Sequence, residues 1–111
     1  MPTIEHDGKA YEVDEEGYLL DWQEWIQPLA GIMAAQDSLE LTESHWEVIT
    51  FLREYFEKYQ IAPMIKILTK EIAKTHGKEK GNTKYLYELY PAGPAKQACR
   101  YAGLPKPTGC V

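Results

Sequence analysis

The sequence is poor in cysteine and has no long apolar run, and both absences narrow the class of protein. None of its apolar stretches approaches the length of a membrane span, and the first residues, MPTIEHDG, lack the charged-then-apolar pattern of a signal peptide. We therefore expect a cytoplasmic protein that is not embedded in a membrane. Because thiols stay reduced in that compartment, its two cysteines are more typical of reactive or inert thiols than of structural disulfides.

Metal-binding and common catalytic motifs are also missing. The three histidines, His6, His45 and His76, belong to different predicted elements, and no C-x-x-C pair accompanies them. There is no haem-attachment motif, no phosphate-binding glycine loop and no Ser-His-acid pattern that would indicate a triad. The sequence therefore predicts no metal site, no cofactor bound by this chain and no standalone active site.

Length and composition indicate one small domain of 111 residues, large enough to bury a core without disulfides. The net charge of −5 hides an asymmetry, because residues 1–60 hold fourteen acidic and three basic side chains, whereas residues 61–111 hold three acidic and nine basic ones. This polarity either steers a partner toward the basic half or only solvates the outer faces of helices. The sequence leaves both interpretations open.

Residues 1–20 are predicted to form a β-hairpin with a two-residue turn at Asp7-Gly8, followed by a second turn at Glu16-Gly17. Residues 21–103 follow as a helical body. Its helices are expected from Asp21 with a break at Pro28, over 39–60 with Thr42 as cap, from Pro63 to Gly77, from Asn82 to Leu89, and over 94–103. The side chains predicted to face inward on the second and third of these helices are Trp46, Ile49, Leu52, Phe56, Tyr59, Met64, Leu68 and Ile72.

The last eight residues, LPKPTGCV (104–111), have no periodicity and are predicted to form a mobile C-terminal arm. The chain is thus expected to be a single mostly α (α+β) domain of hairpin, helical body and arm. Cys99 lies on the final helix and Cys110 on the arm, eleven positions apart. Extended, the arm would carry Cys110 about 25 Å from Gly103. Folded back against Cys99, it could close a disulfide that stabilises the fold by about 3 kcal/mol.

The two cysteines form the leading candidate site, a sulfur shuttle or redox carrier with an extended thiol state and a bridged state. For Cys99 alone, the competing interpretation is a buried and inert thiol. Arg100 and Lys106 are predicted to contact anions or a partner, because of their charge and position beside the cysteines. Because the terminal carboxylate disfavours the neighbouring thiolate, we expect Cys110 to be fully activated only in a positively charged pocket of a partner.

A second candidate site is a helix-turn-helix-like pair of helices joined at YQIAP. Its second helix carries a stripe of lysines that could meet a DNA backbone, namely Lys66, Lys70, Lys74 and Lys78. This helix has no arginine or asparagine where base reading is expected, and the domain is acidic overall. We therefore weight ordinary helix packing above DNA binding.

Five segments carry a family resemblance: GPAKQACRYAGLPKPTGCV, LREYFEKYQIAP, GKEKGNTKYLYELYP, EEGYL and LTESHW. They closely resemble the DsrC family, often called the gamma subunit of dissimilatory sulfite reductase, over nearly the whole chain. The related TusE proteins, which relay sulfur to tRNA thiolation, are similar too but generally keep only the penultimate cysteine. This sequence has a cysteine at both arm positions of the family, Cys99 and Cys110, which favours DsrC.

The resemblance implies a sulfur-carrier cosubstrate. In a sulfite-reducing organism the arm would enter the catalytic subunits of dissimilatory sulfite reductase, which hold the sirohaem and iron–sulfur clusters, and Cys110 would capture partly reduced sulfur. Attack by Cys99 would close a Cys99–S–S–S–Cys110 trisulfide that a membrane redox complex then reduces. In a sulfur-oxidising organism, Cys110 would instead receive a persulfide from a sulfurtransferase. Two alternatives stay open: a TusE-like relay through Cys110 alone, and a DNA-binding regulator, which has less support.

Overall fold

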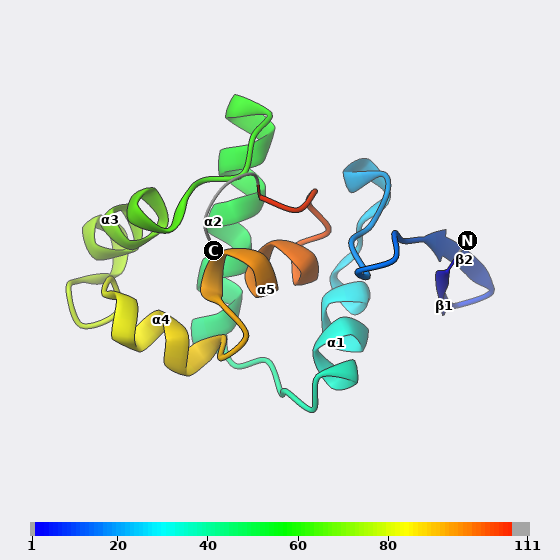
Figure 1. The fold of residues 1–111 in the computed structure, drawn as a ribbon, viewed down its shortest axis with the longest axis horizontal. Coiled ribbons are helices and arrows are strands. Elements are labelled where there is room, and N and C mark those ends of the chain that lie inside the picture. The colour runs from blue at the N-terminus through cyan, green and yellow to red at the C-terminus, as the bar shows by residue number, and fades with distance from the viewer. Residues whose placement is uncertain (1, 108–111) are drawn as a thin grey trace.

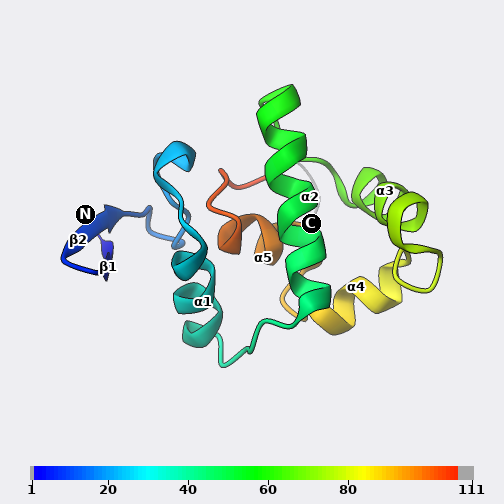
Figure 2. The same cartoon turned by 180° about the vertical axis from the view of Figure 1, so that it is seen from behind.

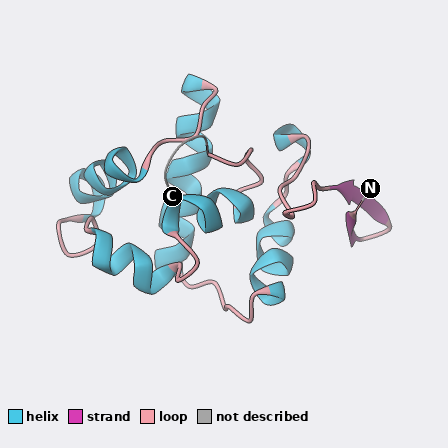
Figure 3. Ribbon diagram, viewed as in Figure 1, coloured by secondary structure: helices cyan, strands magenta, loops and turns pink. Residues whose placement is uncertain are grey.

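Five α-helices and a two-stranded antiparallel hairpin account for the regular structure of residues 2–107, the part of the chain that this computed structural model describes (Figures 1 and 2). In chain order the elements are β1 (Thr3–His6), β2 (Lys9–Glu12), the 3-10 helix η1 (Trp22–Glu24), α1 (Gln27–Gln36), α2 (Glu43–Tyr59), α3 (Ile65–His76), α4 (Thr83–Leu89) and α5 (Pro94–Tyr101). The predicted helical fold with an N-terminal hairpin is confirmed (Figure 3). None of the described helices is both long and apolar enough to cross a bilayer.

The hairpin forms where the sequence predicts it because Asp7 and Gly8 both adopt positive φ angles, 51° and 82°, as the two-residue turn requires. The register places Ile4 opposite Tyr11, and both side chains are buried. The hairpin therefore turns one face toward the helical body. The second predicted turn is also present, with Gly17 at φ 91°.

Pro28 and Thr42 act as predicted at the starts of α1 and α2. Pro28 lies in the first turn of α1, where its missing N–H costs no hydrogen bond. Thr42 is the N-cap of α2, but its partner is a histidine rather than the glutamate or glutamine of most capping boxes. The Nδ1 atom of His45 accepts the Thr42 N–H at 3.0 Å, so its Nε2 carries the hydrogen and donates to the Leu89 carbonyl at 2.8 Å. His45 thereby links the start of α2 to the end of α4.

Two side chains predicted to face the core point outward instead, and both lie at the corner between α2 and α3. Tyr59 is 52% exposed and Met64 is 51% exposed. Tyr59 is the last residue of α2 and Met64 the N-cap of α3, and the chain turns between them through Gln60 at φ 59°. At these helix ends the apolar stripe no longer faces the core. Of the other predicted positions, Trp46 is partly buried, and these are fully buried: Ile49, Leu52, Phe56, Leu68 and Ile72.

The remaining helix boundaries follow local signals. Gly77 ends α3 at a positive φ of 94°, which a glycine adopts without strain. Asn82 caps α4 through its side-chain oxygen, which accepts the Tyr85 N–H at 2.8 Å. Both boundaries agree with the sequence prediction.

The helix that carries Cys99, α5, lies in the middle of the helical body, between α1 and α2 (Figures 1 and 2). Six of its eight residues are buried, and Ala95 and Ala98 are small enough to let the neighbouring helices approach closely. The helix is therefore part of the core on nearly every side, and its position is set by packing rather than by exposure of a functional face.

The C-terminal end of α5 is held by a tryptophan and an arginine, which we call the Trp25–Arg53 clamp. The Trp25 indole Nε1 donates to the Tyr101 carbonyl at 2.8 Å, and Arg53 Nη1 donates to the Ala102 carbonyl at 3.1 Å. The Arg53 guanidinium also lies 4.5 Å from the centroid of the Trp25 ring. Gly103 turns the chain beneath Trp25 at φ 72°, and a Cβ atom there would lie 2.3 Å from Trp25 Cδ1.

Two residues of the predicted arm, Leu104 and Pro107, pack on the body. The Gly103 N–H donates to the Arg100 carbonyl at 3.1 Å and the Leu104 N–H to the Cys99 carbonyl at 3.0 Å, the pair of bonds of a Schellman motif. Leu104 is fully buried, and Pro107 is buried as well. Residues 108–111, and with them Cys110, lie outside the described residues.

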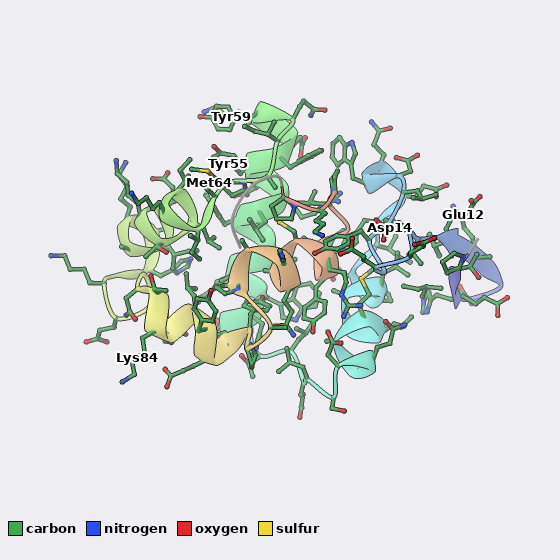
Figure 4. The ribbon with its side chains drawn as sticks, viewed as in Figure 1. Glu12, Asp14, Tyr55, Tyr59, Met64 and Lys84 are labelled. Carbon is green, nitrogen blue, oxygen red and sulfur yellow. The ribbon has the colours of Figure 1, made fainter. Side chains whose placement is uncertain are left out.

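The charge asymmetry of the sequence becomes a separation in space. Glu12 and Asp14 lie at the hairpin end of the molecule, and Lys84 on α4 lies at the opposite end (Figure 4). The molecule measures 41 Å along its longest axis, whereas charges are screened over about 8 Å at physiological ionic strength. Charges at the two ends are therefore screened from each other.

We predict that Gly103→Ala destabilises the fold by about 2–4 kcal/mol, because the added methyl group meets Trp25 and alanine is strained at a positive φ. Gly8→Ala is the matched control: Gly8 also has a positive φ, 82°, but no atom lies within 4 Å of its added Cβ. Its expected cost is about 1 kcal/mol, from backbone strain alone. Urea unfolding of the two variants measures the difference, and equal losses would show that the contact with Trp25 contributes nothing.

Candidate functional site

Cys99 is enclosed by the core. It lies in the last turns of α5, and its side chain is fully buried. Burial raises the pKa of the Cys99 thiol from an ordinary 9.0 to about 12, because a thiolate loses its hydration there. In this conformation Cys99 is a thiol at neutral pH and a poor nucleophile.

A polar network beside Cys99 joins α5 to the end of α1. The Asp37 carboxylate accepts hydrogen bonds from Arg100 and, at 2.6 Å, from the Tyr101 hydroxyl. Gln97 Nε2 donates to the same hydroxyl at 2.8 Å, while Gln97 Oε1 accepts the Ala92 N–H at 2.9 Å. The network therefore fixes both ends of α5, and its buried polar atoms all have partners.

The two predicted contact residues, Arg100 and Lys106, are both paired within the chain. Arg100 forms a salt bridge with Asp37, donates to the Met33 carbonyl at 3.3 Å, and keeps only 14% of its side chain exposed. Lys106 Nζ lies 2.9 Å from a carboxylate oxygen of Glu16 and is more open to solvent. To bind an external anion, either side chain would first have to share or leave its carboxylate.

A polar cavity of about 290 Å³ opens over this face of α5. The Tyr18 hydroxyl lies at its wall and donates to the Lys96 carbonyl at 3.2 Å. Burial, and next the charge that Cys99 would carry, raise the pKa of Tyr18 to about 12, so the hydroxyl stays protonated. The cavity is lined by acidic side chains on Glu16 and Asp37, basic ones on Lys96 and Arg100, and the neutral polar side chains of Tyr18 and Gln97.

The structure brings together Cys99 and Arg100, and Lys106 joins them through Glu16. It also places Tyr18 and Asp37 at the site, two residues that the sequence analysis missed. Tyr18 follows a predicted turn, but no local pattern shows that it reaches α5. Asp37 meets Tyr101 across 64 positions of sequence, a contact that only the fold creates. Cys110, the other half of the predicted site, lies outside the described residues, so the pairing of the two cysteines stays a prediction.

No group of three or more His, Cys, Asp or Glu side chains suited to a metal ion occurs within residues 2–107. Of the three histidines, His45 is occupied by its bonds to Thr42 and Leu89, and His76 Nδ1 lies 3.7 Å from Glu47. Around α5 the described residues offer a buried thiol on Cys99, the hydroxyl of Tyr18 and the paired charges of Arg100 and Lys106.

Known proteins share this fold and sequence over nearly their full length. A family model described as DsrC like protein matches residues 5–111. The sulfurtransferase TusE of Photorhabdus laumondii is 48% identical over 111 residues, which is 100% of both chains. The NMR structure of Allochromatium vinosum DsrC has a TM-score of 0.90 and 66% identity, covering 98% of this chain and 97% of that one.

A crystal structure agrees with these matches. The oxidized gamma subunit of the dissimilatory sulfite reductase (DsrC) from Archaeoglobus fulgidus has a TM-score of 0.85 and 45% identity, covering 99% of this chain and 100% of that one. The similarity includes α5 and the buried segment after it, so it covers the elements that form the candidate site. This chain belongs to the family of DsrC-like proteins.

Proposed function

We propose that this protein is a sulfur relay that carries sulfur as a persulfide on Cys110. The observation that carries the proposal is the burial of Cys99, whose pKa of about 12 leaves almost no thiolate at neutral pH. With two cysteines in the sequence, transfer that needs an accessible thiolate falls to Cys110. The sequence favoured a two-cysteine cosubstrate, but the names of the curated relatives, sulfurtransferase TusE, favour the relay.

The relay needs no external oxidant or reductant. The Cys110 thiolate attacks the terminal sulfur of a donor persulfide, forming a new S–S bond while the donor's thiolate leaves. A thiolate of the acceptor then attacks the terminal sulfur on Cys110, and the Cys110 thiolate leaves in turn. One sulfur atom moves at each step and the number of S–S bonds is conserved. By resemblance to TusE, the sulfur would finally be used in the thiolation of tRNA.

The two-cysteine carrier of dissimilatory sulfite reductase is the second candidate. It is favoured by the presence of both Cys99 and Cys110 and by the 66% identity to Allochromatium vinosum DsrC. In this function Cys110 would hold sulfur that is only partly reduced from sulfite and still carries a hydroxyl group. Attack by the Cys99 thiol would form the new S–S bond with loss of water, and a membrane redox complex would reduce the resulting trisulfide to two thiols and sulfide. The step requires Cys99 to leave its buried site, which breaks the Leu104 bond to the Cys99 carbonyl.

Polysulfide loading of single-cysteine variants tests whether Cys110 takes up sulfur without help from Cys99. We expect Cys99→Ser to gain one sulfur on the tryptic peptide YAGLPKPTGCV as fast as the unaltered protein, because Cys99 takes no part in the relay. We expect Cys110→Ser to lose the modification. Mass spectrometry under non-reducing conditions checks both results. Loss of loading in Cys99→Ser would contradict the relay, which gives Cys99 no part in sulfur uptake.

Alkylation of Cys99 by iodoacetamide is expected to be slow and to rise about tenfold per pH unit from pH 7 to 10, because its pKa lies near 12. At pH 8 its thiolate fraction is about 1000-fold below that of an ordinary thiol with a pKa of 9.0. Quantifying the peptide QACR gives the rate, and urea-unfolded protein is the control. A plateau above pH 9 in the folded protein would show that Cys99 is exposed in solution.

Turnover with sulfite and a dissimilatory sulfite reductase tests the second candidate directly. If the protein acts as the two-cysteine carrier, non-reducing trypsin digestion should yield QACR joined to YAGLPKPTGCV with one sulfur more than a disulfide. The relay predicts separate peptides, because Cys99 remains buried. Cys99→Ser is the control, since it cannot form the joined pair.

A further inference from the structure

A groove runs between α2 and α3, away from the cysteine site. It consists of two adjoining cavities, of about 530 Å³ and 330 Å³, which share Phe51 and Glu54. The larger cavity takes in Ile67 and Glu71 from α3, and the smaller one takes in Thr75 and His76 near the end of that helix. The groove therefore has residues of α2 along its length and residues of α3 on its other side.

The wall formed by α2 is regular. Its residues follow the i,i+4 ridge of the helix: Glu43, Glu47, Phe51, Tyr55 and Tyr59. The Phe51 and Tyr55 rings lie 5.8 Å apart and the Tyr55 and Tyr59 rings 4.6 Å apart, so they form a continuous aromatic ladder. A helix of this length spans about 24 Å, enough for a partner helix of about four turns.

One end of the groove exposes an unusual amount of apolar surface. Tyr59, Ile61, Met64 and Ile67 are between 36% and 61% exposed, and they account for four of the seven exposed large hydrophobic residues of residues 2–107. Tyr55, Tyr59 and Met64 gather where the chain leaves α2 toward α3 (Figure 4). Apolar surface concentrated at one place is typical of an interaction site, and tyrosines often dominate binding there.

The charges lining the groove are mostly negative. Four carboxylates line it, on Glu43, Glu47, Glu54 and Glu71, whereas the basic side chains are Lys58 and His76. Lys80 pairs with Glu47 at 3.1 Å and Lys74 with Glu71 at 3.7 Å. Glu43 and Glu54 have no ion pair within the part of the chain that the structure describes. The carboxylates of Glu43 and Glu54 are therefore available to pair with basic side chains of a partner polypeptide.

We propose that this groove docks an amphipathic helix of a partner protein, with apolar side chains against the aromatic ladder and lysines or arginines beside the unpaired carboxylates. The recognition mode is that of a helix in a hydrophobic groove, with anchors at i, i+3 or i+4 and i+7. The proposal does not depend on which sulfur reaction Cys110 performs, because the groove contains neither cysteine. It gives the protein a recognition surface separate from the residues that carry sulfur.

The probe is a synthetic 16-residue helix with leucines on one face and lysines on the other, compared with the same peptide carrying glutamates instead of lysines. Each is titrated into the isotope-labelled full-length protein, and amide shifts are followed by NMR. Tyr59→Ser and Glu54→Lys alter the groove at exposed positions. Tyr87→Ser and Glu88→Lys make the same changes at exposed positions of α4, away from the groove.

We expect the lysine peptide to shift amides of α2 and α3 along the groove, and each groove variant to weaken its binding about tenfold, the effect of one interface hot spot. The α4 variants should bind within about twofold of the unaltered protein. Four results would overturn the proposal: no binding of the lysine peptide, equal binding of the glutamate peptide, shifts that map to the acidic hairpin, or equal effects of Glu54→Lys and Glu88→Lys. Self-association of the protein that Glu54→Lys abolishes would also overturn it, because the occupant would then be a second copy.

Discussion

The buried state of Cys99 depends on one arginine stacked on two indole rings. Arg53 lies 4.5 Å from the Trp25 ring and 5.3 Å from the Trp22 ring, and it donates to backbone carbonyls on both sides of the clamp, those of Trp22 and Ala102. A guanidinium suits this half-buried place because it is weakly hydrated, flat and able to donate in several directions. With the arginine in place, the chain turns at Gly103, Leu104 enters the core, and the last turn of α5 closes over the thiol.

Because Cys99 is packed in this way, the two functions that the family names suggest differ in free-energy cost: only the two-cysteine carrier uses Cys99. The proposed relay through Cys110 would make no use of Cys99, whereas exposing Cys99 by opening the last turn of α5 would take Leu104 out of the core and break two backbone hydrogen bonds. Exposing a leucine costs about 2 kcal/mol and two hydrogen bonds about 2 kcal/mol more. An open state at about 4 kcal/mol is populated on the order of once in a thousand molecules, so a partner would have to bind that state preferentially.

Most of the fold could be predicted from short-range signals in the sequence. The Asp7-Gly8 turn, the break at Pro28 and the caps at Thr42 and Asn82 are short-range signals, and the structure has all of them. Periodicity failed only at helix ends, where Tyr59 and Met64 continue the apolar stripe but no neighbour covers them. The surroundings of Cys99 were less predictable: Asp37, Trp25 and Arg53 reach α5 across 49 to 76 positions. No spacing rule within one helix encodes such contacts.

The burial of Leu104 and Pro107 also shortens the tether of the sulfur carrier. The sequence predicts that all eight residues of the arm, 104–111, are mobile. With Pro107 buried, only three peptide steps separate the packed chain from Cys110, and three steps span about 11 Å at most. Under the proposed relay, a sulfur donor must therefore bind the body closely enough to bring its own sulfur within that distance of Pro107. Accuracy of docking, rather than length of reach, then decides which proteins can exchange sulfur with this one.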